Sequence, residues 1–371
     1  MMKKAIKIVF KVLLYTMAII VGGYYGLAFI GALMNGIEGV AYFFDFLLAI
    51  FLAYNINVIV HESGHLVFGL FTGYRFCSFR IWSFMLIKQD GKLNLRRFKL
   101  MGTGGQCLMI PPEHEETKAS VILYNLGGII FNLIFAILCF ALNNILPKVY
   151  ILSTFLWMSA VLSIFMLLTN GIPLNVGGIA NDGMNALQLS KNHEAASSFK
   201  KQLLINAAQT EGLRLSEMPD EWFTLPDGAD MHNTHNASLA VCAAGRLFDS
   251  GDIKAVEEAT EALLNSDYNI VGLHRSLLTC DLVYCRLIND SGEVDGLLTP
   301  ELAKFMSAMK NYPSVIRTEY TIALLKNSDV AKSEKILSQY EKIAHKFPYQ
   351  QEIESERVLM SNALKKFKNE Q

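Results

Sequence analysis

The pentad His61-Glu62-Ser63-Gly64-His65 is the part of the chain whose residue types and spacing point most directly to chemistry. Residues four apart lie on one face of a helix, so both imidazoles can hold one metal ion while Glu62 reaches a water bound beside them. Two histidines, a carboxylate base and an open position for water are parts of a catalytic zinc site. The pentad therefore predicts a zinc hydrolase with His61 and His65 as ligands and Glu62 as the general base.

A plain alternative is that the pentad is only a pair of hydrogen-bonded histidines near a helix end. Its surroundings argue against that alternative, because the pentad ends an apolar run that begins near Val40. Ionisable side chains in an apolar membrane helix are costly and are by default functional. We therefore favour a metal site, with one Zn²⁺ per chain.

Zinc bound by two imidazoles needs at least one more protein ligand, and a carboxylate is the usual one. Asp182 is the only Asp or Glu between Glu116 and Glu194. Taken alone, residues 181–183 would be an ordinary Asn-Asp-Gly turn and helix cap. At roughly 1.5 Å of rise per residue, a helix that enters the membrane near Tyr42 reaches His61 after roughly 28 Å, close to the cytoplasmic edge. Asp182 should lie at that same depth, which favours it as the third ligand.

The composition places the chain among membrane proteins, since 52% of its residues are hydrophobic, 18% are charged and the mean hydropathy is +0.29. Four apolar stretches are long enough to cross a hydrocarbon core of roughly 30 Å. They are Val12–Ile37, Tyr42–Tyr74, Ala119–Asn143 and Val149–Gly171. We expect a mainly α-helical fold with about four spans, the first of them a retained anchor rather than a cleaved signal peptide.

Lysine and arginine are concentrated in two of the connecting segments. The first residues and the stretch from Arg75 to Lys118 are basic, whereas Met34–Gly39 has no Lys or Arg and Asn144–Val149 has only Lys148. By the positive-inside rule, the N-terminus, the basic connection and the C-terminal part all face the cytoplasm, and we expect a bacterial cell membrane. The balance of 33 basic and 34 acidic residues gives no sign of nucleic-acid binding.

The basic connection predicts a cytoplasmic β-hairpin. Phe79–Ile87 and Lys92–Phe98 are the expected strands, joined by a turn at Asp90-Gly91. Its unpaired edge could accept an unwound substrate as an added strand, because helical peptide bonds are closed to attack. A membrane-surface hairpin with solvated charges is the open alternative.

The remainder of the chain predicts a soluble helical domain. Ala237–Leu264 and Pro313–Ala344 each suggest a helical pair of tetratricopeptide type, and Tyr268–Met309 a less regular pair. Because fewer than three clean repeats are visible, a generic helical bundle is a serious alternative. Its expected role is docking of a cytoplasmic protein or regulation. We divide the chain into an anchor at 1–39, a zinc protease core at 40–189, a linker and helix at 190–236, and the helical domain at 237–371.

Two further motifs carry a resemblance to a known family. Gly128-Ile129-Ile130-Phe131-Asn132 resembles the Gly-Pro-x-x-Asn of the site-2 proteases, and Asn170 to Gly183 resembles their Asn-x-x-Pro-x-Pro-x-x-Asp-Gly. The resemblance covers about residues 40–189. It departs at Ile129 and in a loop some four residues longer before Asp182. It implies an intramembrane zinc metalloprotease with Asn132 and Asn170 as polar groups near the scissile bond.

We therefore expect an endopeptidase that cuts membrane-embedded or membrane-proximal segments near the cytoplasmic face. Its partners would be a membrane-protein substrate and the lipid bilayer. The alternative from another class is a non-catalytic adaptor, in which the zinc site is vestigial or structural. Glu62 argues against an adaptor, because a structural site needs ligands but no base.

Overall fold

The computed structural model describes residues 23, 30–31, 34, 36–89, 91–98, 104–112, 118–147, 149–176 and 179–370. Within these residues the chain forms two compact units. The first takes in the described parts of Met1–His65, Leu126–Leu174 and Asn181–Met184. The second takes in those of Leu66–Asn125, Asn175–Ala180 and Asn185–Gln371.

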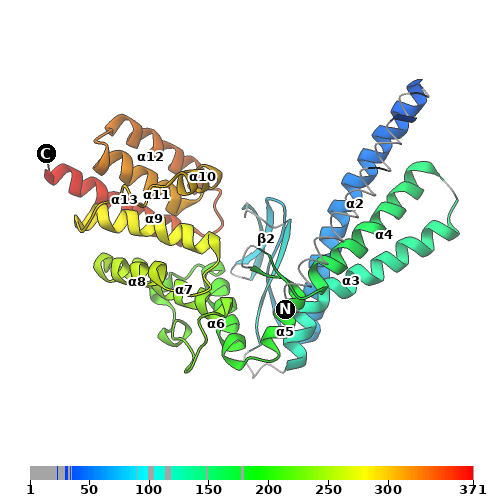
Figure 1. Ribbon diagram of the computed structural model, residues 1–371, viewed down its shortest axis with the longest axis horizontal. Helices are drawn as coiled ribbons and strands as arrows, with labels where there is room; N and C mark the ends of the chain where they lie inside the picture. The colour runs from blue at the N-terminus through cyan, green and yellow to red at the C-terminus, as the bar shows by residue number, and fades with distance from the viewer. Residues whose placement is uncertain are drawn as a thin grey trace. The chain divides into compact units, whose positions relative to one another are not determined.

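Three helices are long and apolar enough to cross a membrane (Figure 1). They are α2 (Gly36–Phe71), α3 (Lys118–Ile145) and α4 (Tyr150–Gly171). Their most apolar stretches average hydropathies of 2.0 to 2.2, and a helix satisfies its own backbone in lipid. The last three predicted spans are confirmed as membrane-capable helices. The predicted span Val12–Ile37 falls almost wholly outside the described residues.

The membrane helices meet through small and polar residues. A Cβ added to Gly64 of α2 would lie 2.2 Å from the carbonyl oxygen of Gly127, so α2 and α3 approach to backbone distance there. On α2, the buried amide of Asn57 donates to the Ser159 carbonyl of α4 at 3.2 Å and accepts from the Ser163 hydroxyl. Such interhelical bonds contribute about 0.6 to 2 kcal/mol each in membranes.

An antiparallel sheet follows α2, with the strand order β3-β2-β1-β4. Its strands are β1 (Arg75–Ile81), β2 (Phe84–Gln89), β3 (Lys92–Arg97) and β4 (Gly105–Ile110). The predicted strand Phe79–Ile87 was wrong as a single strand, because the chain reverses at Trp82, whose φ is +55°. Arg80 holds this turn by donating to the Trp82 carbonyl at 2.8 Å. The sheet therefore has four strands rather than the two of a hairpin.

One face of the sheet is packed against helices. Tyr74, Cys107 and Met109 form a core with Tyr124 of α3 and Leu203 of α6 (His193–Thr210). The Tyr124 hydroxyl donates to the Cys107 carbonyl at 3.1 Å. Two short strands, β5 (Asn175–Val176) and β6 (Ile179–Ala180), pair with each other after α4.

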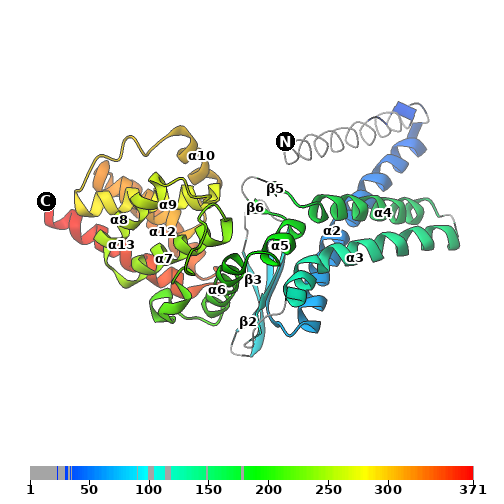
Figure 2. The same ribbon diagram turned by 60° about the horizontal axis from the view of Figure 1, so that its bottom comes forward.

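The remaining elements of the described residues are helices (Figure 2). After α5 (Asp182–Leu189) and α6 come the 3₁₀ turns η1 (Leu215–Glu217) and η2 (Asp220–Trp222). They are followed by α7 (Thr234–Ser250), α8 (Ile253–Asn265), α9 (Gly272–Asn289), α10 (Pro300–Ala308), α11 (Pro313–Thr321), the π-helical η3 (Ile322–Lys326), α12 (Val330–Ala344) and α13 (Gln350–Glu370). The helices predicted at Ala237–Leu264 and Pro313–Ala344 are present. Their tetratricopeptide character stays a prediction.

Candidate metal centre

The pentad lies in α2 and places its two histidines together. Their Nε2 atoms are 3.3 Å apart, and the ring planes are nearly perpendicular. Both side chains are buried, as is Glu62 beside them in the same helix. The helix thus produces the juxtaposition expected from the spacing of four residues.

Asp182, the first residue of α5, meets both histidines although it lies far from them in sequence. Its Oδ2 atom is 3.1 Å from Nε2 of His61 and 3.5 Å from Nε2 of His65. Among the described residues, these three form the group of His, Cys, Asp and Glu side chains whose ligand atoms converge, all within 4.8 Å of one another. The structure therefore brings together all three predicted ligands.

The donor set fits a zinc ion. Zinc lies about 2.0–2.2 Å from nitrogen and carboxylate ligands, and tetrahedral ligands at that distance are about 3.3–3.6 Å apart. The separations of 3.1, 3.3 and 3.5 Å all lie within about 0.2 Å of this range. Asp182 Oδ2 is also a buried atom without a hydrogen-bond donor in the described part of the chain. Burial opposes a charge on Asp182, but when no metal is bound and His65 and His61 are protonated, their charges hold the pKa of this carboxyl below its usual range.

Asn132 of α3 orients one of the imidazoles. Its Oδ1 atom is 2.6 Å from Nδ1 of His61, and Asn132 is fully buried. Because an amide oxygen only accepts, His61 donates from Nδ1 and keeps the lone pair of Nε2 for a metal. The Nδ2 group of Asn132 has no hydrogen-bond partner in the described residues. The same side chain can thus fix His61 and still offer a donor.

Gly128 makes room for the imidazoles. A Cβ at this position would lie 2.6 Å from Cε1 of His61 and 2.7 Å from Nε2 of His65. Any larger residue would displace the rings. The two ends of the Gly-x-x-x-Asn motif therefore have separate physical roles: Gly128 leaves space for the imidazoles, and Asn132 forms a hydrogen bond with one of them.

Asn181 forms contacts with the end of α4 that the sequence did not predict, since residues 181–183 suggested only an ordinary turn and helix cap. Its Nδ2 donates to the carbonyls of Thr169 and Ile172, both at 2.7 Å. Its Oδ1 accepts from the backbone N–H groups of Leu174 and Met184 at 3.1 and 3.0 Å. Asn181 therefore caps α5 and ties it to the end of α4, which positions Asp182. The Asn-Asp-Gly sequence contained a signal for this, because Asn is a preferred helix cap.

Gly183 permits the same close approach. A Cβ there would lie 2.2 Å from the carbonyl oxygen of Gly171, the last residue of α4. Asn170, the other predicted polar residue, donates to the Met166 carbonyl one turn earlier in α4 at 3.1 Å. Its amide hydrogen bond thus stays within its own helix.

The comparison with protein families supplies independent support. Residues 46–155 match peptidase family M50, the site-2 protease family. The predicted family is confirmed. The match contains the pentad and Asn132 and ends before Asn170 and Asp182. Comparisons with curated proteins and with solved structures give no match.

The match to M50 over residues 46–155 has general consequences for the chain. The family consists of zinc metalloproteases that act at membranes, so the match supports a metalloprotease at the level of the family. Together with the three apolar helices, it makes this chain an integral membrane protein.

Proposed function

We propose that the chain is a zinc-dependent intramembrane endopeptidase that cuts membrane-embedded or membrane-proximal segments near the cytoplasmic face. The observation that carries the proposal is the convergence of His61, His65 and Asp182 from two distant segments beside a buried Glu62. The non-catalytic adaptor remains the competing hypothesis.

Each residue has a distinct task in the proposed reaction. His61, His65 and Asp182 hold the zinc, which when bound acidifies its water toward a pKa of roughly 7 and polarises the scissile carbonyl. Glu62 accepts the proton of the attacking water and passes it to the nitrogen of the leaving amine. Asn132 keeps the tautomer of His61 fixed through both proton transfers.

The sheet offers a way to present an unwound substrate. β3 is an end strand of the sheet, and its side chains Leu93 and Leu95 are 60% and 68% exposed. An extended segment could pair with this free edge as an added strand.

The helical domain at 237–371 would dock a cytoplasmic partner or regulate cleavage. In the same proposal, this domain follows an anchor at 1–39, a protease core at 40–189, and a linker and helix at 190–236.

The test separates base from ligand. Glu62→Gln should keep one zinc per chain and the fold while cleavage falls by at least about a hundredfold, as is typical for loss of a general base. The readout is quantitative mass spectrometry of new peptide termini in membranes, with uncut substrate captured by the variant. Asp45→Asn is the matched control, since it removes a carboxylate from the same helix roughly 25 Å away at about 1.5 Å per residue.

Two outcomes would contradict the mechanism. If membranes with the wild-type protein and with Glu62→Gln contain the same new peptide termini, Glu62 is not the general base of a protease. That result would support the adaptor. Loss of zinc in Glu62→Gln would instead make Glu62 a ligand.

A further inference from the structure

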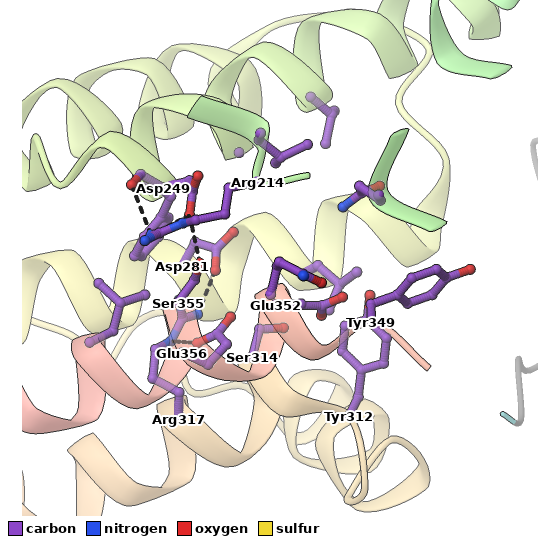
Figure 3. Close-up of a pocket in the computed structure, with 18 of the residues that line it drawn as sticks. Arg214, Asp249, Asp281, Tyr312, Ser314, Arg317, Tyr349, Glu352, Ser355 and Glu356 are labelled. Atoms are coloured by element: carbon purple, nitrogen blue, oxygen red, sulfur yellow. Dashed lines mark hydrogen bonds and ion pairs between the residues drawn. The ribbon is translucent and has the colours of Figure 1, made fainter. Parts of the chain in front are cut away.

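A cavity of about 240 Å³ lies among the C-terminal helices (Figure 3). Helices α7, α9, α11 and α13 line it, together with the segment that follows α6. Typical small-molecule sites measure roughly 300–1,000 Å³. This cavity therefore suits one side chain or a small compound, and the proposed protease chemistry does not use it.

One acidic group in the cavity wall is fully satisfied. Asp249 binds Arg214 at 2.7 Å and accepts hydrogen bonds from the Ser216 backbone and hydroxyl and from the Ser355 hydroxyl. These contacts hold the pKa of Asp249 at about 2, although its burial acts in the opposite direction. Asp249 and Arg214 neutralise each other, so this pair stabilises the cavity wall and adds no net charge to it.

Arg317, the second cation in the cavity wall, pairs with more than one carboxylate. Arg317 is 1% exposed and lies between Asp281 and Glu356, as Figure 3 shows. Its Nη2 is 2.5 Å from Asp281 Oδ1, but its Nε is 3.5 Å from Glu356 Oε2. Glu356 is 7% exposed, and its Oε2 has no hydrogen-bond donor in the described residues. A buried carboxylate oxygen thus borders the cavity with its hydrogen-bonding capacity unfilled.

Glu352, one turn before Glu356 on α13, has no ion-pair partner in the described part of the chain. Its carboxyl accepts a hydrogen bond from the Tyr312 side chain. Burial, and then the charge of Glu356, raise the pKa of Glu352 to about 8, and burial raises that of Glu356 to about 7. His274 adds no compensating charge, because burial lowers its pKa.

We propose that this cavity binds a cationic nitrogen group, an ammonium or guanidinium, carried by a basic peptide side chain or by a small free amine. The inner wall places three carboxyl groups, those of Asp281, Glu352 and Glu356, beside the single cation Arg317. A bound cation would favour the ionised form of the carboxyl groups that Arg317 does not neutralise. A cation with N–H donors supplies a positive charge beside Glu352 and Glu356 and a hydrogen bond to the unfilled Oε2 of Glu356. An anionic ligand is disfavoured, because Arg317 is already engaged by two carboxylates.

The test uses the full chain in detergent micelles and calorimetric titration with three probes. They are spermidine, the capped tripeptide Ala-Lys-Ala, and the same peptide with uncharged norleucine in place of lysine. We expect spermidine or the lysine peptide to bind and the norleucine peptide not to bind. Spermidine binding alone identifies a free-amine site, and lysine-peptide binding identifies a peptide site.

Variants locate the binding. Glu352→Gln and Glu356→Gln should each weaken it about tenfold or more, because each removes a charge-assisted partner. Glu354→Gln is the matched control, since Glu354 is exposed on the same helix and pairs with Arg357. Failure of both cations to bind would overturn the proposal. Equal binding of lysine and norleucine peptides, or unchanged affinity in both variants, would overturn it as well.

Discussion

At the scale of single residues, the candidate centre depends on side chains that never touch the metal. The tautomer of His61 follows from its hydrogen bond with Asn132, and the position of Asp182 follows from four hydrogen bonds of Asn181. Supporting groups of this kind influence metal affinity by orienting the ligands. Substitutions beside the ligands therefore test the geometry as well as substitutions of the ligands do.

We expect Asn132→Ala to weaken zinc binding about 10- to 100-fold, because His61 loses the acceptor that fixes its ring. Asn132→Asp should restore much of the affinity, since a carboxylate oxygen accepts the same hydrogen bond. Competition with a chelator measures both values. Asn144→Ala is the control on the same helix, where the amide donates only along its own helix to Phe140. Unchanged zinc affinity in Asn132→Ala would exclude the positioning role.

We expect Asp182→Asn to keep α5 folded and to lose most of the bound zinc. The helix survives because Asn181, not Asp182, provides the cap, and zinc is lost because a neutral amide is a poor zinc ligand. Metal analysis and circular dichroism of the purified variant check the two expectations. Full zinc content with normal cleavage would mean that Asp182 is a turn residue and that the third ligand comes from elsewhere.

Sequence reasoning reached the residue types of the site and less of its support. His61, Glu62 and His65 share one helical turn, so a local rule was enough to group them. The contacts of Asn181 with α4 were not predicted, because they depend on carbonyls at the end of α4 that only the tertiary structure brings near.

At the scale of elements, long apolar helices were easier to predict than short strands. The three membrane-capable helices carry a uniform signal, whereas the break at Trp82-Ser83 has no Gly, Pro, Asn or Asp to mark it. That turn depends on Arg80 and on the bond from Trp82 N–H to the Gly104 carbonyl at 2.8 Å. β4 was missed because it pairs with β1 across the intervening hairpin of β2 and β3.

Helix α13 should make the helical part sensitive to pH. The pKa values of Glu352 and Glu356 are raised to about 8 and about 7, above the roughly 4.3 of an unfolded glutamate. Because the folded state binds these protons more tightly, the stabilisation is complete below about pH 4.3 and is lost as the pH rises through 7 to 8. Hydrogen-exchange protection of α11 and α13 should therefore fall as the pH rises from about 4.3 to about 8 and then level off.

Glu352→Gln should flatten that fall, since the amide does not titrate, and Glu354→Gln should leave it unchanged. Parallel measurements on the full chain, corrected for the intrinsic exchange rate, give the comparison. An equally steep decline in Glu352→Gln and in the wild-type protein would show that Glu352 does not titrate in this range.

At the scale of the whole molecule, function depends on where the membrane places the chain. Three described helices have the length and hydropathy to cross it, and the basic connection follows the pentad helix after only Thr72, Gly73 and Tyr74. The positive-inside rule then predicts that the pentad lies near the cytoplasmic face.

Reporters inserted near Gln89 and fused after Gln371 should both report the cytoplasm, and one near Asn35 should report the outside. Two crossings, α3 and α4, separate the first two positions and return the chain to the same side. Opposite sides for Gln89 and Gln371 would require an odd number of crossings and would separate His61 from Asp182. As controls, the same three positions carry a second reporter that is active only outside the cytoplasm and should give the opposite pattern.

The distance along the chain between the pentad and Asp182 also determines how late in biosynthesis the proposed zinc ligands can come together. His61 and Asp182 are 121 positions apart in the sequence, and the hydrogen bonds of Asn181 that place Asp182 need the end of α4 as well. A ribosome must therefore deliver nearly half of the chain before the proposed zinc ligands can meet. Truncated or stalled products that stop short of Asp182 would enter the membrane with an incomplete site. Unfinished copies of the chain would therefore lack one of the ligands that the proposed reaction requires.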